Sequence, residues 1–330
     1  MDILSLAVTA GAAFLITALS GKWVIPFLRK LKFGQTILED GPAWHKKKQG
    51  TPTMGGMMFI LGIVLAVLLG ALTLHLNGGA GEAQLHLIAG VIMAVAFGTL
   101  GFADDYIKVV KKQNLGLTAK QKMAGQLLIS VAYLAVLYLG GETSTVLQIP
   151  FLGQLDIGLL YYPFAVLVIV GAVNAVNLTD GIDGLCSSVT FVAAIGLMFV
   201  ANIAANNEMN LLAVALAGGC LGFLCWNFHP AKVFMGDTGS LFLGGMICAL
   251  AFGLRMPLLL VFVGIIYIVE TMSVILQVIS FKTTGKRIFK MSPIHHHYEM
   301  SGWSEEKIVA AFSAVTAVGC VLAVLSALLA

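Results

Sequence analysis

The sequence predicts an all-α, polytopic membrane protein, and three observations lead to this prediction. Of the 330 residues, 59% are hydrophobic and only 11% are charged, whereas a soluble domain carries about 25% charged residues. About ten apolar runs are long enough, or nearly so, to cross a bilayer as helices. Lysine and arginine are concentrated in alternate loops between these runs. We therefore expect a single integral-membrane domain over residues 1–330.

The expected transmembrane helices follow one another in the order of the chain. They cover about residues 3–28, 54–74, 86–103, 122–140, 159–177, 186–204, 210–228, 239–254, 257–281 and 307–328. Pro257 is expected to begin the ninth helix, because the first helical residue needs no partner for an N–H. The first run follows Asp2 without a basic segment, which favours a retained helix over a cleaved signal peptide.

The distribution of basic residues predicts the orientation of these helices. The loops after runs one, three, seven and nine carry lysines and arginines, whereas the other loops hold only Arg255 and several acidic residues. By the positive-inside rule, the basic loops face the cytoplasm and both termini lie outside. All the polar motifs described below fall on that cytoplasmic side, and the outer loops are chemically plain. We therefore expect an active site at the cytoplasmic face.

The chain is organised around a polar stretch, 174–184, that ends the fifth apolar run. Polar groups are costly in a membrane unless they face protein, water or a ligand. If the stretch is helical, Asn174, Asn177, Asp180 and Asp183 form a ladder of i, i+3 neighbours on one face. If its two glycines end the helix, both carboxylates lie on a loop. A polar turn that only links two membrane helices is the structural alternative.

Two further acidic motifs lie at the same membrane face. Asp104 and Asp105 end the third run, and because helical neighbours point about 100° apart, one can face a site while the other faces a partner. Solvated charge at the membrane surface is the structural alternative. Asp237 lies in a glycine-flanked segment before the eighth run. It either receives a phosphate and its metal at a helix start, or shares with Thr238 and Ser240 the role of a simple helix cap.

Three weaker motifs complete the set. The glycine-rich loop 48–56 permits close backbone approach to a ligand and offers the charge of Lys48. The three consecutive histidines 295–297 cannot all bind one ion from a regular helix, so we interpret them as donors to anionic oxygens, with a surface loop as the alternative. Glu270 lies inside the ninth run and is either a site residue or a structural hydrogen-bonding partner. Gln277, near the cytoplasmic end of that run, can reach the site.

Together these residues predict phosphoryl transfer. The set contains carboxylates, lysines, amides, imidazoles and glycine-flanked backbone, and it contains no serine–histidine triad, haem ligand pair or Walker A loop. Mg²⁺ with a few carboxylates and phosphate oxygens suits the acidic motifs better than calcium, because the spacing of an EF-hand is missing. Mg²⁺ and lysine can neutralise a diphosphate while the protein positions both reactants.

Five motifs, in this order along the chain, are similar to those of one known family. They are KQGTPTMGG at 48–56, GFADDY at 101–106, NAVNLTDGIDG at 174–184, VFMGDTGS at 233–240 and PIHHHYE at 293–299. The chain resembles the bacterial phospho-N-acetylmuramoyl-pentapeptide transferases, within the polyprenyl-phosphate N-acetylhexosamine-1-phosphate transferase superfamily. The resemblance extends essentially from end to end, and no motif position departs from the family pattern.

The resemblance implies an enzyme of the bacterial inner membrane that acts in peptidoglycan synthesis, and so in cell-wall growth, cell shape and division. Such an enzyme transfers phospho-MurNAc-pentapeptide from UDP-MurNAc-pentapeptide to undecaprenyl phosphate, which gives lipid I and UMP. The resemblance further implies Mg²⁺ as the cofactor, membrane lipids as the surroundings and a homodimer. A nucleic-acid partner is not expected.

The resemblance also assigns expected roles to individual residues. Asp237 corresponds to the magnesium ligand. The expected catalytic residues are Asp104, Asp105, Asp180, Asp237 and His296. The nucleoside end of the donor is expected to contact Lys48, Leu178, Asp183, Phe234 and Gly236. Further expected substrate contacts are Thr53, Lys108, Lys120, Asn177, Asn227, Gln277, His295 and His297.

The chemistry of these side chains agrees with the expected roles, and two other classes of function remain as alternatives. Phe234 can stack on a nucleobase and Asp183 can accept a hydrogen bond from a uracil N–H. A related transferase with UDP-GlcNAc or a similar donor is the nearest alternative, and the motif at 293–299 argues against it. An ion-coupled transporter would place charges deep in the membrane in two repeated halves; here only Glu270 is deep. A non-enzymatic scaffold does not need so many aspartates on one face.

Overall fold

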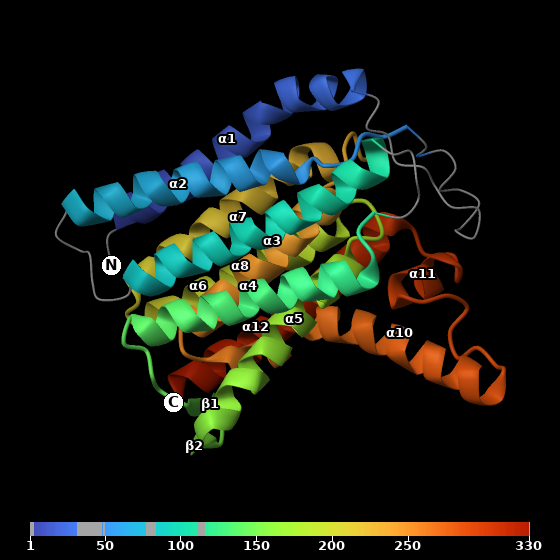
Figure 1. Ribbon diagram of the computed structural model, residues 1–330. Coiled ribbons are helices and arrows are strands. Elements are labelled where there is room, and N and C mark those ends of the chain that lie inside the picture. The colour runs from blue at the N-terminus through green and yellow to red at the C-terminus, as the bar shows by residue number, and fades with distance from the viewer. Residues whose placement is uncertain (1–2, 32–47, 49, 77–83, 111–115, 330) are drawn as a thin grey trace.

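The computed structural model describes residues 3–31, 48, 50–76, 84–110 and 116–329, and most of these residues are helical (Figure 1). Ten described helices are long and apolar enough to cross a membrane, which confirms the number of predicted spans. They are α1 (Ile3–Lys30), α2 (Gly56–Leu76), α3 (Gln84–Val110), α4 (Ala119–Leu139), α5 (Tyr161–Thr179), α6 (Leu185–Ile203), α7 (Asn207–Asn227), α8 (Gly236–Gly253), α10 (Ile265–Thr284) and α12 (Glu305–Leu328).

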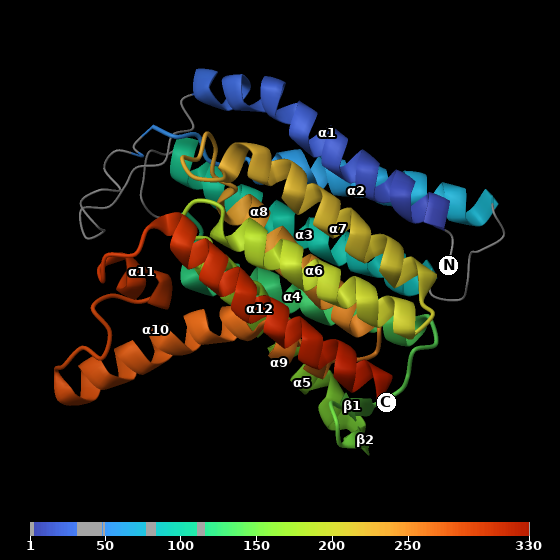
Figure 2. The ribbon, with the colours of Figure 1, turned by 180° about the vertical axis from the view of Figure 1, so that it is seen from behind.

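Helix α8 forms the centre of the bundle. It packs against α2, α3, α5, α6 and α7, and 89% of its residues are buried. Helices α1 and α2 cover one side of this centre, and α6 and α12 cover another (Figures 1 and 2). A helix that is apolar all round is stable only when it is surrounded, so the burial of α8 fixes the position of the motif at its first turn.

The ninth predicted span differs from the expectation of one helix over 257–281. The structure has a 3₁₀ turn, η3 (Pro257–Leu259), and a short helix, α9 (Leu260–Val263), before α10 begins at Ile265. Pro257 occupies the first helical position, as expected, but of η3. Gly264, with φ −100° and ψ 17°, separates α9 from α10. After this break α10 diverges from the bundle (Figures 1 and 2).

Two short strands were not predicted from the sequence. Strands β1 (Val146–Ile149) and β2 (Gly153–Asp156) form an antiparallel hairpin with Val146 opposite Asp156 and Ile149 opposite Gly153. The hairpin lies at the end of the bundle where α1 begins and α12 ends (Figure 1). The first turn of α8 and the short helix α11 (Ile294–Glu299) lie towards the opposite end. The fold therefore separates the polar motifs from the ends of the first and last helices.

A close helix crossing brings the acidic motifs of α3 and α8 together. At Gly101 of α3, an added Cβ would overlap the carbonyl oxygen of Asp237 at the start of α8. Asp104 and Asp105 follow one turn later on α3. Glycine at 101 thus permits the approach that places all three carboxylates in one region.

This crossing gives a test of packing. We expect Gly101→Ala to destabilise the protein by about 1–3 kcal/mol, because an added methyl group forces backbone apart in a packed core. The measurement is thermal unfolding in detergent. Gly171→Ala in α5 is the matched control, since a Cβ there meets nothing within 4 Å and alanine favours helix. Equal melting temperatures for the two variants would contradict this account of the crossing.

Candidate active site

Asp237 is the centre of the acidic cluster at the start of α8. Its Oδ2 atom accepts hydrogen bonds from the ammonium groups of Lys108 at 3.0 Å and Lys122 at 2.8 Å. Its Oδ1 atom accepts one from the Asn177 amide at 2.9 Å, and that amide also donates to Ser240 Oγ at 2.7 Å. Residues from α3, α4 and α5 therefore meet at one carboxylate of α8.

Asp105 caps α8 from another helix. Its Oδ1 accepts from the Asp237 N–H at 3.2 Å, and its Oδ2 accepts from the N–H and hydroxyl of Thr238 at 2.9 and 2.7 Å. Asp237, Thr238 and Ser240 were the candidate helix caps. The N-cap residue of α8 is Met235 instead, and its side chain makes no capping hydrogen bond. The first N–H groups of a helix need acceptors and favour negative charge. Asp105, buried at 4% exposure, supplies both.

Asp104 completes a group of three carboxylates. Its Oδ2 lies 2.6 Å from Lys108 Nζ, and its Oδ1 accepts from the Leu117 N–H at 2.7 Å. One oxygen from each of Asp104, Asp105 and Asp237 lies within 4.8 Å of the others. Carboxylate oxygens are the protein ligands that Mg²⁺ prefers, so this donor set fits a magnesium ion. The structure thus brings the predicted metal ligand beside two predicted catalytic aspartates.

Lys122 is a site residue that the sequence reasoning missed. It lies on α4 one helical turn before buried Gln126, and its ammonium group reaches Asp237. Lys120, which was predicted instead, is exposed and makes no hydrogen bond or ion pair with the residues that the structure describes. Residues two positions apart on a helix point in directions that differ by about 200°, so only one of these two lysines can face the cluster. Lys122 precedes the inward-facing Gln126 and Ser130 by four and eight residues. This spacing places it on the same face of α4 and is the signal that identifies it.

The stretch 174–184 takes the second of the two forms considered, a helix ended by a glycine-containing loop. Helix α5 ends at Thr179, Asp180 follows as its C-cap, and Gly184 has a left-handed φ of 75° before α6. Asn177 is the residue of this stretch that reaches Asp237. Asn174 faces away, because its amide pairs with that of Gln126 at 2.7 and 3.1 Å.

Asp180 lies in an electrostatically negative environment. Burial raises the pKa of its carboxyl group to about 8, and the charges of Asp237, Asp105 and Asp183 act in the same direction. A cation bound among these carboxylates opposes that rise, because it favours the ionised form. The raised pKa of Asp180 therefore indicates that a cation bound here would stabilise the ionised carboxylates.

A second ionic cluster surrounds Asp183. Its Oδ1 accepts from Lys48 Nζ at 2.7 Å, and its Oδ2 accepts from the Ala231 N–H at 2.9 Å and lies 3.1 Å from His229 Nδ1. Glu305, the first residue of α12, accepts from the Asp183 N–H at 2.9 Å and from Lys48 at 2.7 Å. Lys48 and Asp183, both predicted site residues, are thus in direct contact. Sequence reasoning did not identify His229 or Glu305.

The loop before α2 and the loop before α8 run together beside these clusters. The N–H of Phe234 donates to Pro52 at 2.8 Å, and the N–H groups of Gly55 and Gly56 donate to Phe234 and Met235 at 2.8 and 3.0 Å. Thr53 is buried and approaches Gly236, which has a left-handed φ of 69°. This pairing places Thr53, Phe234 and Gly236 next to the acidic cluster. Phe234 is half-buried.

Two more predicted residues support the loops of this region. Asn227 is buried, accepts from the Gly184 N–H at 3.2 Å and donates to the Val233 carbonyl at 2.9 Å. It therefore ties the loop after α5 to the loop before α8. Leu178 is half-buried in the last turn of α5.

The histidine motif forms α11, and its three imidazoles have different partners. His295 Nδ1 lies 3.0 Å from Glu270 Oε1, and both side chains are fully buried. His295 also packs on Gly181, where an added Cβ would collide with its ring. His296 Nδ1 lies 2.6 Å from Glu299, and His297 accepts from the Lys290 N–H at 3.1 Å. Glu270 is thus engaged with the motif from inside α10.

Gln277 is committed to backbone near the motif. Its amide nitrogen donates to the Phe289 carbonyl at 3.0 Å, and its oxygen accepts from the N–H groups of Ile288 and Phe289 at 3.0 Å. These contacts hold the segment after α10. The structure does not place Gln277 or Lys120 among the residues that contact Asp237.

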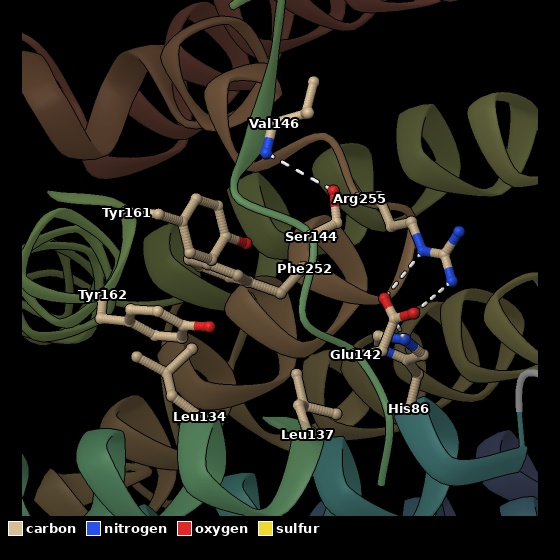
Figure 3. A pocket seen from close by; sticks show the side chains of 10 residues that line it. All are labelled: His86, Leu134, Leu137, Glu142, Ser144, Val146, Tyr161, Tyr162, Phe252 and Arg255. Atoms are coloured by element: carbon tan, nitrogen blue, oxygen red, sulfur yellow. Dashed lines mark hydrogen bonds and ion pairs between the residues drawn. The ribbon is translucent and has the colours of Figure 1, made fainter. Parts of the chain in front are cut away.

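The opposite end of the bundle contains a small polar pocket (Figure 3). Arg255 donates to Glu142 at 2.9 Å through Nε, and His86 Nε2 lies 3.3 Å from the same carboxylate. The aromatic rings of Tyr161 and Tyr162 line its other side (Figure 3). Its volume of about 40 Å³ accommodates water but not a nucleotide. This end is less plain than the sequence suggested, but it lies away from the acidic cluster.

Comparison with known proteins agrees with the geometry. Residues 85–255 match the family model described as glycosyl transferase family 4. The chain is 49% identical over 311 residues to a phospho-N-acetylmuramoyl-pentapeptide-transferase of Heliobacterium modesticaldum, covering 94% of both chains. It is 49% identical over 313 residues to that of Bacillus subtilis, again covering 94% of both, and 50% identical over 300 residues to that of Bacillus licheniformis, covering 91% and 90%. With this identity over nearly the full length, and with the acidic residues of its motifs gathered at one end of a ten-helix bundle, the chain belongs to the phospho-N-acetylmuramoyl-pentapeptide transferase family.

Proposed function

We propose that this protein transfers phospho-MurNAc-pentapeptide from UDP-MurNAc-pentapeptide to undecaprenyl phosphate in peptidoglycan synthesis. A phosphate oxygen of the lipid attacks the phosphorus bound to the sugar, the bond from that phosphorus to UMP breaks, and lipid I and UMP result. The convergence of Asp104, Asp105 and Asp237 with two lysines in a member of this family is the observation that carries the proposal.

The acidic cluster suits a Mg²⁺ ion held chiefly by Asp237, which when bound supplies charge neutralisation of the diphosphate. Asp104 and Asp105 lie close enough to support it. Lys108 and Lys122 add two positive charges on the same side of Asp237. Phosphoryl transfer depends on such alignment and neutralisation more than on covalent chemistry by the protein. Asp180 and His296 are assigned to this catalytic group through the family.

Asp104 fits a positioning role better than that of an obligatory base. The second pKa of a phosphate monoester is about 6, so near neutral pH the acceptor is mainly the dianion and has no proton to lose. Asp104 already binds Lys108 and the Leu117 N–H. It therefore orients the lysine that meets the negative reactants.

The donor nucleoside is assigned to the side where Lys48 and Asp183 meet. The aromatic ring of half-buried Phe234 can stack on uracil. Among the residues that the structure describes, Asp183 Oδ1 accepts a hydrogen bond from Lys48, and it can accept a second one. The other residues assigned to substrate through the family are Thr53, Lys108, Asn177, Leu178, Asn227, Gly236, Gln277, His295 and His297. The contact of Lys122 with Asp237 and the exposure of Lys120 favour Lys122 over Lys120 for this role.

The acceptor lipid must approach from within the bilayer, because its polyprenyl chain is apolar. Helix α10 diverges from the bundle (Figure 1) and exposes large apolar side chains along its length. They include Ile268, Met272, Ile275 and Ile279. The buried contact of Glu270 with His295 links this lipid-facing helix to the histidine motif. We assign the surface of α10 to the acceptor chain.

We further propose that the enzyme is a homodimer in the bacterial inner membrane, with its active site in the cytoplasm and both termini outside. The basic segments next to the acidic cluster support this orientation under the positive-inside rule. A cytoplasmic site also matches the soluble nucleotide donor. The role in cell shape and division follows from lipid I as a cell-wall precursor.

The proposed reaction is tested by release of UMP from UDP-MurNAc-pentapeptide and polyprenyl phosphate in detergent. We expect release that requires Mg²⁺, and we expect Asp237→Asn to lose at least about a hundredfold in turnover, because an electrostatic contact to the reacting phosphates is lost. UDP-GlcNAc serves as the control donor. Turnover of UDP-GlcNAc in place of the muramoyl donor would assign the protein to a related transferase, and near-normal activity of the variant would remove the metal role of Asp237.

The two nearby lysines of α4 give a matched pair. Lys122→Ala should lower kcat by about a hundredfold, because it removes a charge from the cluster that neutralises the diphosphate. Lys120→Ala should retain near-normal kcat, since its side chain is exposed and away from Asp237. Single-turnover assays of both variants provide the measurement. A large loss in the Lys120 variant with a normal Lys122 variant would reverse this assignment.

The orientation is tested by labelling of single cysteines in intact cells. In a Cys225→Ser background, Gln154→Cys in the β hairpin should react with an impermeant maleimide, and Lys286→Cys after α10 should react only after the cells are opened. Both positions are exposed in the structure, so access of the reagent is decided by the membrane. The reverse pattern would place the acidic cluster outside the cell.

A further inference from the structure

Glu305 is a buried acidic residue that has no part in the proposed function so far. It is the first residue of α12, outside the five motifs, and only 8% of it is exposed. A carboxylate is seldom buried without partners that compensate its charge. The identity of those partners indicates what Glu305 does.

Glu305 connects the two residues assigned to the donor nucleoside. Its Oε2 accepts a hydrogen bond from the main-chain N–H of Asp183 at 2.9 Å, and its carboxylate lies 2.7 Å from Lys48 Nζ. Capping of α12 is provided by the neighbouring Ser304, whose hydroxyl accepts from the Lys307 N–H. The Glu305 side chain is therefore available to reach across to the loop after α5 and to Lys48 in the segment before α2.

The cluster has the geometry of an ion-pair network centred on a lysine. Asp183, His229 and Glu305 present ligand atoms that lie close together. The Lys48 ammonium group, however, lies 2.7 Å from both carboxylates, where it supplies the positive charge that they require. His229 lies 3.1 Å from Asp183 and 3.5 Å from Glu305, and completes the ring of partners.

We propose that Glu305 is a positioning residue for the nucleoside end of the donor, an inference that rests on the proposed function. It acts through Lys48 and Asp183: it holds the ammonium group of the first and the backbone of the second. The Lys48 ammonium group is thereby kept next to the Asp183 carboxylate. The loop that carries Asp183 is held in the conformation to which the nucleoside binds.

The position of Glu305 predicts a specific kinetic effect. The phosphates react at the cluster around Asp237, which Glu305 does not contact, whereas Lys48 and Asp183 lie at the nucleoside end. Loss of the Glu305 charge should therefore weaken donor binding and leave the chemical step nearly unchanged. An interaction that is equally strong in ground state and transition state changes KM and not kcat.

The test compares Glu305→Gln with Glu306→Gln in the full-length protein. We expect Glu305→Gln to raise the donor KM and the dissociation constant for UMP by about tenfold to a hundredfold, the range for a lost hydrogen bond to a charged group. The acceptor KM and kcat should stay within about twofold, a difference worth little free energy. Glu306→Gln is the matched control, because its side chain is 47% exposed and lies 3.9 Å from His229.

Two further measurements separate positioning from stability. Glu305→Asp keeps the charge and should raise the UMP dissociation constant less than Glu305→Gln; it carries the test if the glutamine variant does not fold. In a Lys48→Gln background, Glu305→Gln should have a smaller effect than in the wild type, because part of its action is through that lysine. Normal UMP affinity in Glu305→Gln, or equal increases in donor and acceptor KM with a lowered melting temperature, would overturn the inference.

The binding measurement also keeps this inference distinct from the proposed reaction. If the wild-type protein fails to release UMP from UDP-MurNAc-pentapeptide, the proposed reaction is wrong. UMP affinity, measured by calorimetry without turnover, still reports whether Glu305 organises a nucleotide site. A wild-type protein that turns over the donor while Glu305→Gln binds UMP normally overturns the inference alone.

Discussion

The ion pairs of Asp237 with Lys108 and Lys122 allow several acidic residues to share one end of a membrane bundle. Neighbouring carboxylates repel one another, and burial adds to that cost. The two lysines, the Asn177 amide and the first N–H groups of α8 compensate the negative charge from different directions. Each partner belongs to a different helix or helix terminus, so the packing of the bundle and the electrostatics of the site depend on each other.

The same physical arrangement recurs at the second cluster, around Asp183. Lys48 joins Asp183 and Glu305, and thereby connects the segment before α2, the loop after α5 and the start of α12. At both clusters a lysine from a different part of the chain lies between acidic groups. Helices with rigid apolar contacts supply the frame, and these lysines fix the loops at its end. Both clusters are thus built from residues that are distant in sequence and close together in space.

Hydrophobic run length was sufficient to predict the number and order of the spans, because it reflects the thickness of the bilayer and not the details of packing. The break at Gly264 was not predicted, since a glycine inside an apolar run leaves the periodicity unchanged. Neither was the cap on α8 by Asp105, because a partner 132 residues away leaves no local pattern. Lys120 was expected at the site through the resemblance alone. The helical phase of α4, in which Lys122 shares a face with buried Gln126 and Ser130, indicates Lys122 instead. Glu305 and His229 were missed because neither belongs to one of the five recognised motifs.

The cap that Asp105 provides on α8 affects the interpretation of genetic data on this family. Its carboxylate holds the N–H groups of Asp237 and Thr238 while it also lies in the group of three acidic oxygens. A substitution at this position alters the frame of the neighbouring aspartate together with the local charge. A substitution of Asp105 that abolishes activity would therefore not by itself show that this carboxylate contacts the reacting phosphates, because the loss of the cap on α8 would have the same effect.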